Sequence, residues 1–502
     1  MTAAGWLERL ERAGNRLPDP ATVFVLALSV LAIVSEVAAR AGWTVRRDGG
    51  LIESASLLRS EGLWWLTSHA VENFVTFPPL GVVLVGMLGI GLAERSGLLG
   101  RLIELTVARV PARAITPVIV GVGVLSSLGL DAGYVVLPPL AALTYRSLGR
   151  PPAAGIAAAF AGVSAGFSAN LVPTALDPLL AGFTETGAQL IDADYRVAVT
   201  ANWYFMAAST LALAAVGWWV SVAVVEPRLA TDAQDAAATV PEDPSEPTAA
   251  REGRALGVTA IAAGLLVAAI AAAILIPGAP LHGMGTRFPR WVEAMVPLLA
   301  LTFFVPGLVY GVMSGVFRSD RDVARALGGI MSDLGPYIVL AFFAAQFIGA
   351  FGYTHLGEMM AFSGGRALAD LAVPRGLLLA AFVTMVMGAN LVIGSASAKY
   401  AFIAPIFVPL FMQAGIAPEA TQAAYRVGDS ITNVITPLNP YMVIIVAQFM
   451  RFSPARAGMG TVVATMLPYS IAFALTWMPL FGLWLLLGLP LGPGAPIALE
   501  GV

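Results

Sequence analysis

Seven apolar stretches, each about as long as a membrane-spanning helix, dominate this sequence of 502 residues. A spanning helix needs about 20 mainly apolar residues. Only 12% of the residues are charged, which is roughly half the share in soluble proteins, and the mean hydropathy is +0.81. The sequence therefore predicts an all-α polytopic membrane protein, with spans at 21–42, 74–93, 199–225, 255–277, 291–317, 336–352 and within 458–489.

Several function classes are disfavoured by composition and motifs. The net charge of −3 gives no reason to expect nucleic acid as a partner, and the absence of cysteine excludes disulfides and thiolate chemistry. No phosphate-binding GxxxxGK[ST] loop occurs. Residues 162–166, GVSAG, match the nucleophile elbow of hydrolases, but that motif needs a strand–turn–helix context and a histidine partner. The alanine-rich surroundings argue against a membrane hydrolase.

The first 20 residues, MTAAGWLERLERAGNRLPDP, predict an amphipathic helix on the membrane surface rather than a signal peptide. Its arginines precede the first span and favour a cytoplasmic N-terminus. The acidic stretch 226–254 predicts a soluble linker between an N-terminal half, 1–225, and a C-terminal half, 255–502. Residues 318–333 predict a surface helix or loop.

Two apolar regions that are broken by Gly, Pro and polar clusters resemble each other. They cover about 114–178 and 377–450. DAGYVVLPP at 131–139 aligns with SAKYAFIAP at 397–405, and SANLVPTALDP at 168–178 aligns with SITNVITPLNP at 430–440. We interpret the two regions as repeats, each beginning with a re-entrant hairpin whose tip is polar.

Matching interruptions in two halves of a membrane protein are typical of secondary transporters. Irregular backbone at membrane depth is tolerated where protein covers it or where it lines a cavity. In transporters such breaks from inverted repeats meet near the middle of the bilayer and form the substrate and ion sites. We expect the two repeats to be inverted.

Charged side chains within these breaks are the strongest candidates for function, because charge in a membrane region is costly. Lys399 is the only lysine, and it either snorkels from a hairpin tip or holds the tip or an anionic group. Arg426 and Asp429 are three residues apart and share one face of a predicted helix that begins at Pro418. They act either as an ion pair that locks helices or as a substrate clamp and coupling site.

In the first half, the acidic candidates are Asp131 and Asp177. Asp177 either caps a helix or ligates Na⁺. Neutral oxygens could complete a sodium site or simply satisfy free backbone groups, and the candidates of this kind are Asn170, Thr174, Asn390, Ser397, Asn433 and Thr436. Asp177, Asn170 and Asn433 are the candidate Na⁺ ligands.

The sequence resembles the aminobenzoyl-glutamate transporter (AbgT) family over nearly its full length. The resemblance begins at LERLERAGNRLPDPATVF, 7–24, and is strongest in GSASAKYAFIAPIFVP, 394–409, and AAYRVGDSITNVITPLNPY, 423–441. It implies nine spans and two re-entrant hairpins, divided into a scaffold and a transport core, in a homodimer. By match to the family's motifs, it implies functional roles for Asp177, Ser397, Tyr400, Pro418, Arg426, Asp429 and Pro437. Tyr400 departs from the family, which usually has tryptophan there.

The resemblance implies transport of p-aminobenzoyl-glutamate, whose aromatic ring could stack on Tyr400 while Arg426 binds a carboxylate. We expect a cation-coupled secondary transporter with H⁺ or Na⁺ as coupling ion and no organic cofactor. The alternative on the same fold is a proton-driven exporter of sulfonamides and p-aminobenzoate. A passive channel, which would need no ion gradient, is the alternative outside the class of coupled transporters.

Overall fold

The computed structural model describes residues 20–47, 50–108, 110–129, 132–229, 246–286, 288–370, 373–439, 441–452 and 458–499. The predicted N-terminal surface helix lies outside these residues, apart from Pro20. Within them, eight helices are long and apolar enough to cross a membrane. They are α2 (Pro20–Ala41), α5 (Pro78–Arg95), α11 (Trp203–Val220) with its extension, α13 (Glu246–Leu275), α15 (Met295–Ser314), α17 (Gly335–Tyr353), α20 (Ala396–Gln413) and α23 (Met459–Leu486).

The seven predicted spans are confirmed as helices, and α20 is an eighth that lies inside the second broken region. The first half also contains a short antiparallel ribbon of β1 (Thr44–Arg47) and β2 (Gly50–Glu53), which the sequence analysis did not predict. The ribbon is followed by α3 (Ser60–Ser68) and α4 (Ala70–Val75).

The first broken region forms a helical hairpin followed by an interrupted helix. After α6 (Leu98–Ala108) and the short turn η1 (Ala112–Ala114), α7 (Ile115–Leu125) leads through η2 (Ser126–Gly129) into α8 (Ala132–Ser147). Next, α9 (Pro152–Phe160) continues as the π-helix η3 (Ala161–Ala165), and the backbone is irregular until α10 (Leu176–Ala188) begins.

The second broken region has the same order of elements. It follows α18 (Leu356–Asp370) and consists of α19 (Arg375–Asn390), a tip at 391–395, α20, α21 (Pro418–Asn433), a break and α22 (Met442–Phe452). The two regions pack reciprocally, because α10 of the first contacts α20 of the second while α22 of the second contacts α8 of the first.

Helices occupy both ends of the predicted linker, 226–254. The π-helix η4 (Ser221–Val225) and α12 (Glu226–Leu229) extend α11, and α13 begins at Glu246, so only 230–245 lies outside the described residues. Acidic residues suggested a solvated segment, but two of them pair with arginines. Glu226 lies 2.6 Å from Arg150, and Glu252 lies 3.1 Å from Arg101.

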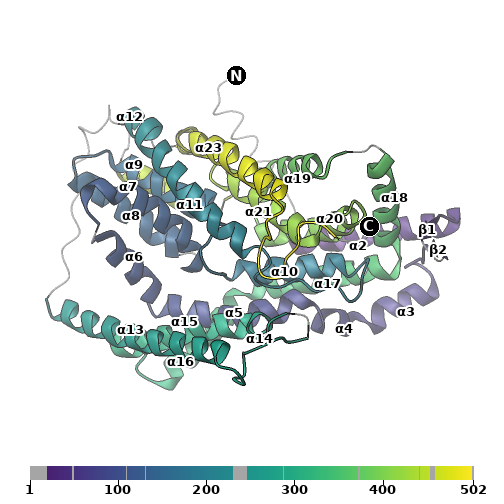
Figure 1. The fold of residues 1–502 in the computed structure, drawn as a ribbon, viewed down its shortest axis with the longest axis horizontal. Coiled ribbons are helices and arrows are strands. Elements are labelled where there is room, and N and C mark those ends of the chain that lie inside the picture. Colours follow the sequence, from purple (N-terminus) through teal and green to yellow (C-terminus); the bar gives the residue numbers. More distant parts are fainter. Residues whose placement is uncertain are drawn as a thin grey trace.

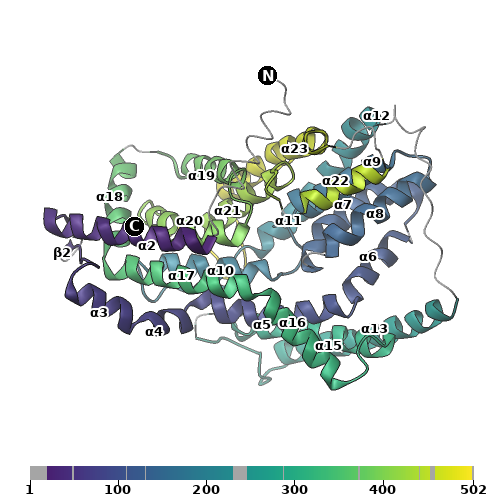
Figure 2. The same cartoon turned by 180° about the vertical axis from the view of Figure 1, so that it is seen from behind.

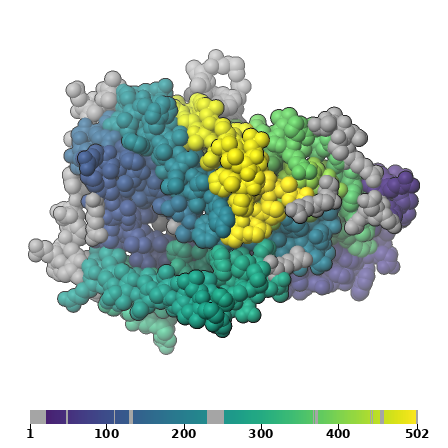
Figure 3. Space-filling model, viewed as in Figure 1, coloured from purple at the N-terminus to yellow at the C-terminus, as the bar shows by residue number. Residues whose placement is uncertain are grey.

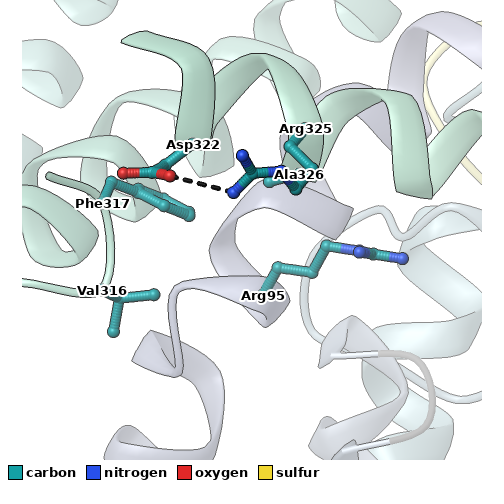
Figure 4. A pocket seen from close by; sticks show the side chains of 6 residues that line it. All are labelled: Arg95, Val316, Phe317, Asp322, Arg325 and Ala326. Carbon is teal, nitrogen blue, oxygen red and sulfur yellow. Dashed lines mark hydrogen bonds and ion pairs between the residues drawn. The ribbon is translucent and has the colours of Figure 1, made fainter. Parts of the chain in front are cut away.

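The surface segment predicted at 318–333 is confirmed as α16 (Asp320–Asp333). The short helix α14 (Arg290–Glu293) comes before α15 in the chain, and α16 comes after it. Ser319 caps α16, and its hydroxyl accepts a hydrogen bond from the amide of Asp322. A surface pocket of about 280 Å³ lies between α16 and the end of α5 (Figure 4). Its lining includes Arg95 and Arg325 but no residue of α21.

The elements of both broken regions gather along one long side of the molecule. In Figures 1 and 2, α13, α15 and α16 occupy one long edge, while α19, α21 and α23 lie toward the opposite one. Figure 3 shows the yellow α23 crossing the surface between the blue-teal helices of the first half and the green ones of the second. Helix α21 packs against α10, α19, α20, α23 and η3, so it lies where the two halves meet.

Candidate functional site

Helix α21 is buried although half of its side chains are polar. Pro418 occupies its first turn, as predicted, and every residue from Pro418 to Thr432 is buried. Gly428 allows α19 to approach closely, because a Cβ there would lie 2.6 Å from the carbonyl oxygen of Val383. Buried polar groups need partners, and those of α21 find them on both halves of the chain.

Arg426 joins α21 to the break in the first half. Its Nη1 donates to Oδ1 of Asp177 at 2.6 Å, and Nη2 donates to the carbonyl oxygen of Ser168 at 2.8 Å. The other carboxylate oxygen of Asp177 accepts hydrogen bonds from the backbone N–H and hydroxyl of Thr174. Asp177 lies in the first turn of α10, so its carboxylate holds the backbone just before the helix and is also the countercharge of Arg426.

Asp429 joins α21 to the second hairpin. Its Oδ1 lies 2.5 Å from Nζ of Lys399, and both side chains are almost completely buried, with exposures of 1% and 0%. The hydroxyl of Tyr425 donates to the same oxygen at 3.3 Å. Although Arg426 and Asp429 are one helical turn apart, each pairs with a partner on a different element, so of the two alternatives the ion pair between these residues is not formed.

Lys399 does not snorkel to the surface. Besides Asp429, its ammonium group donates to Oδ1 of Asn390 and, at 3.4 Å, to the carbonyl oxygen of Ile393 in the hairpin tip. The alternative prediction, that the lysine holds the tip, agrees with this geometry. Asn390 extends the network, because its Nδ2 lies 2.6 Å from the carbonyl oxygen of Asp429 and 2.8 Å from Oδ1 of Asn433.

Tyr400 is fully buried between helices. Its ring centroid lies 4.1 Å from that of Tyr425, and its hydroxyl lies 2.7 Å from Oγ1 of Thr184. Thr184 in turn donates to Oε1 of Gln422 at 2.9 Å. An aromatic substrate could stack on Tyr400 only after these side chains separate.

The remaining predicted residues lie at the tips and breaks. Ser397 is half-buried beside Ser395 at the second tip, and Pro437 is buried in the break after α21. Asn170 donates to Ser127 of the first tip at 2.6 Å. The candidate Na⁺ ligands Asp177, Asn170 and Asn433 thus bond to different partners, and in the described ranges no three His, Cys, Asp or Glu residues form a metal-binding group. Asp131 lies outside the described residues.

Two residues of this site, Asn439 and Glu419, were not among the predicted site residues. Asn439 donates to the hydroxyl of Ser164 at 3.0 Å, which gives the serine of the GVSAG sequence an amide partner. Glu419 accepts a hydrogen bond from the hydroxyl of Tyr195 at 2.9 Å. The available sequence signal was the spacing of polar residues along one face of α21, at 419, 422, 426 and 429.

Within the residues that the structure describes, four buried polar atoms near α21 have no hydrogen-bond partner: Nε of Arg426, Nε2 of Gln422, Oδ1 of Asn170 and Oδ1 of Asn202. Burying a polar atom without a partner is costly, so these atoms are available to a bound ligand. The guanidinium can bind a carboxylate, and the three amides can bind neutral polar groups.

The sequence model described as "AbgT putative transporter family" matches residues 5–499. The chain belongs to the AbgT family. It is 33% identical to the p-aminobenzoyl-glutamate transport protein of Escherichia coli (strain K12) over 506 aligned positions, which cover 98% of this chain and 96% of the relative. The family and this relative are transporters, so the chain is a transporter and not an enzyme.

Two solved AbgT structures share the fold. The YdaH transporter of Alcanivorax borkumensis is 42% identical, with a TM-score of 0.90 over 95% of this chain and 100% of that structure. MtrF of Neisseria gonorrhoeae is 41% identical, with a TM-score of 0.87 over 98% of this chain and 100% of that one, and it is described as illuminating a class of antimetabolite efflux pumps.

Proposed function

We propose that this AbgT protein is a cation-coupled secondary transporter of p-aminobenzoyl-glutamate or a related aromatic acid conjugate. The observation that carries the proposal is Arg426, a buried guanidinium that links α21 to the first break and whose Nε has no hydrogen-bond partner among the described residues. A substrate carboxylate that replaces Asp177 on Arg426 would release α10 from α21. Binding would then be linked to movement of one half against the other.

The proposed movement uses two inverted repeats, with α7–α8 and α19–α20 as re-entrant hairpins and the long spans as scaffold. Ser168 and Ser430, which are 262 residues apart, bond to each other. The same offset aligns Arg426 with Ser164 and Asp177 with Asn439. The contact of Arg426 with Asp177 is therefore matched by that of Ser164 with Asn439, which supports a twofold relation because such units exchange equivalent contacts.

Proton-driven export of sulfonamides and p-aminobenzoate is the second candidate. It is favoured by the likeness to MtrF, whose description names antimetabolite efflux. Both candidates share an aromatic ring next to an acidic group, which one guanidinium can recognise. We further propose a homodimer in the bacterial inner membrane, with the N-terminus cytoplasmic.

The test uses the purified protein in liposomes. Labelled p-aminobenzoyl-glutamate and a labelled sulfonamide are supplied separately, and a pH gradient and a Na⁺ gradient are imposed in turn. Uphill accumulation of the first compound supports the main proposal, and that of the second supports the alternative. A passive channel would only equilibrate the compounds, and failure of both gradients to drive either compound would refute coupled transport.

A further inference from the structure

Three carboxylates are buried in the part of the chain that the structure describes, and they differ in their partners. Asp177 pairs with Arg426 and Asp429 pairs with Lys399. Glu419 is 3% exposed, and within those residues it forms no ion pair. Its Oε2 accepts a hydrogen bond from the hydroxyl of Tyr195.

The surroundings of Glu419 supply neutral groups rather than a countercharge. Asn202 binds the backbone of Glu419 itself, because its Nδ2 donates to the carbonyl oxygen of Glu419 at 2.9 Å. The titratable side chains that face the carboxylate are Tyr195 from the loop after α10 and Tyr400 from α20. Other charged or titratable side chains lie on the elements that pack around this end of α21, and each has its own partner. Glu185 accepts a hydrogen bond from the backbone N–H of Val197, while Arg196 and Arg375 donate to the carbonyl oxygens of Ala193 and Ala414. Lys399 pairs with Asp429, and the hydroxyl of Tyr469 bonds that of Ser221.

A stripe of polar side chains connects Glu419 with the charged centre of the site. Gln422, Arg426 and Asp429 follow Glu419 at intervals of three, four and three residues, which places all four on one face of α21. The stripe is about 15 Å long at the rise of an α-helix. Gln422 lies between Glu419 and Arg426, and its unpaired Nε2 offers a donor to a water molecule or proton carrier on this path.

We propose that Glu419 is the residue that binds and releases the coupling proton. The proposal rests on the proposed function, with H⁺ as the coupling ion. A buried carboxylate without a countercharge is stabilised when it takes a proton from water, and it must be exposed to water to release that proton. The loop that carries Tyr195 also carries the exposed Asp192, Asp194 and Arg196, so a movement of this loop would open Glu419 to solvent. The other two buried carboxylates, Asp177 and Asp429, already have countercharges in Arg426 and Lys399.

Glu419→Gln tests the proposal, because glutamine mimics the protonated side chain. In liposomes, the variant is expected to exchange labelled for unlabelled substrate, which needs no net proton movement, but to lose accumulation driven by a pH gradient. Glu185→Gln is the matched control, since Glu185 contacts the same loop through Val197 but is only half-buried. It is expected to keep the pH-driven accumulation.

A second measurement follows protons directly. Substrate added to weakly buffered wild-type protein in detergent is expected to change the signal of a pH-indicator dye, and Glu419→Gln is expected to abolish this change.

If Glu419→Gln lowers the yield of folded protein, Tyr195→Phe replaces it and is expected to shift the pH profile of transport. Retention of pH-driven accumulation by Glu419→Gln, or an unshifted profile in Tyr195→Phe, overturns the assignment of Glu419. Wild-type protein that responds only to Na⁺ overturns it too, and wild-type protein that responds to no gradient refutes the proposed function itself.

Discussion

Arg426 and Asp177 are 249 residues apart in the sequence, yet Nη1 of the arginine lies 2.6 Å from Oδ1 of the aspartate. The pair closes the contact between the two helix breaks, and a second bond from Nη2 to the carbonyl oxygen of Ser168 fixes the plane of the guanidinium. Because an ammonium group cannot reproduce this planar two-point geometry, the site depends on arginine and not merely on positive charge.

Arg426→Lys is therefore expected to fold and to weaken substrate binding. Loss of a hydrogen bond to a charged group costs about 1.5–3 kcal/mol, which corresponds to a fall in affinity of roughly 10- to 100-fold. Calorimetry with p-aminobenzoyl-glutamate measures this change. Arg325 is an exposed arginine on α16, so Arg325→Lys is the control and should bind the substrate with wild-type affinity. Equal affinity in Arg426→Lys would mean that Arg426 does not contact the substrate.

The buried pair of Lys399 and Asp429 predicts a compensation between two substitutions. Lys399→Met leaves Asp429 buried without its countercharge, which costs about 3–5 kcal/mol of folding free energy. Adding Asp429→Asn removes that charge, so the double variant should melt closer to the wild type than Lys399→Met does. Thermal unfolding in detergent, followed by tryptophan fluorescence, provides the comparison. A double variant that melts no higher than Lys399→Met would show that the lysine stabilises chiefly through Asn390 and the hairpin tip.

The contact between Ser164 and Asn439 predicts that a cross-link across the breaks stops transport. The chain contains no cysteine, so Ser164→Cys with Asn439→Cys can be studied without removing others. Oγ of Ser164 lies 3.0 Å from Nδ2 of Asn439, so the two cysteines would be neighbours and oxidation is expected to join them. Transport should stop once the bond has formed if the breaks must separate. A reductant should restore it, and each single cysteine variant should be unaffected by the oxidant. Full transport with the cross-link formed would mean that the two breaks move as one body.

The spans and the start of α21 were predictable because they depend on local signals. Apolar stretches of sufficient length predicted seven helices, and Pro418 followed by Glu419 predicted a helix start. The helix ends within 226–254 were missed because Glu226 and Glu252 are stabilised by Arg150 and Arg101, contacts that composition does not reveal.

The partners of the site residues were not predictable, because they come from distant parts of the chain. The three-residue spacing of Arg426 and Asp429 indicates a shared face, but it does not exclude stronger partners on other elements. Glu419 has the local sequence context of an acid in a first helical turn. Its burial depends on Tyr195, which is 224 residues away.

Close packing of α19 on α21 gives the last prediction. A Cβ on Gly428 would lie 2.6 Å from the backbone oxygen of Val383, whereas a Cβ on Gly388 would meet nothing within 4 Å. Gly428→Ala is expected to push the helices apart and to destabilise the protein by about 1–3 kcal/mol, as overpacking does. Gly388→Ala, on α19 itself, should be neutral or stabilising by up to about 1 kcal/mol, because alanine favours the helix.

Thermal unfolding of the two alanine variants under one detergent condition measures the difference. Substrate binding supplies a second measurement, because Gly428 lies between Arg426 and Asp429 and a displaced α21 would move both away from Asp177 and Lys399. Gly428→Ala should therefore lower both the substrate affinity and the melting temperature. Gly388→Ala should lower neither the affinity nor the melting temperature. Equal melting temperatures for the two variants would contradict the tight contact between α19 and α21.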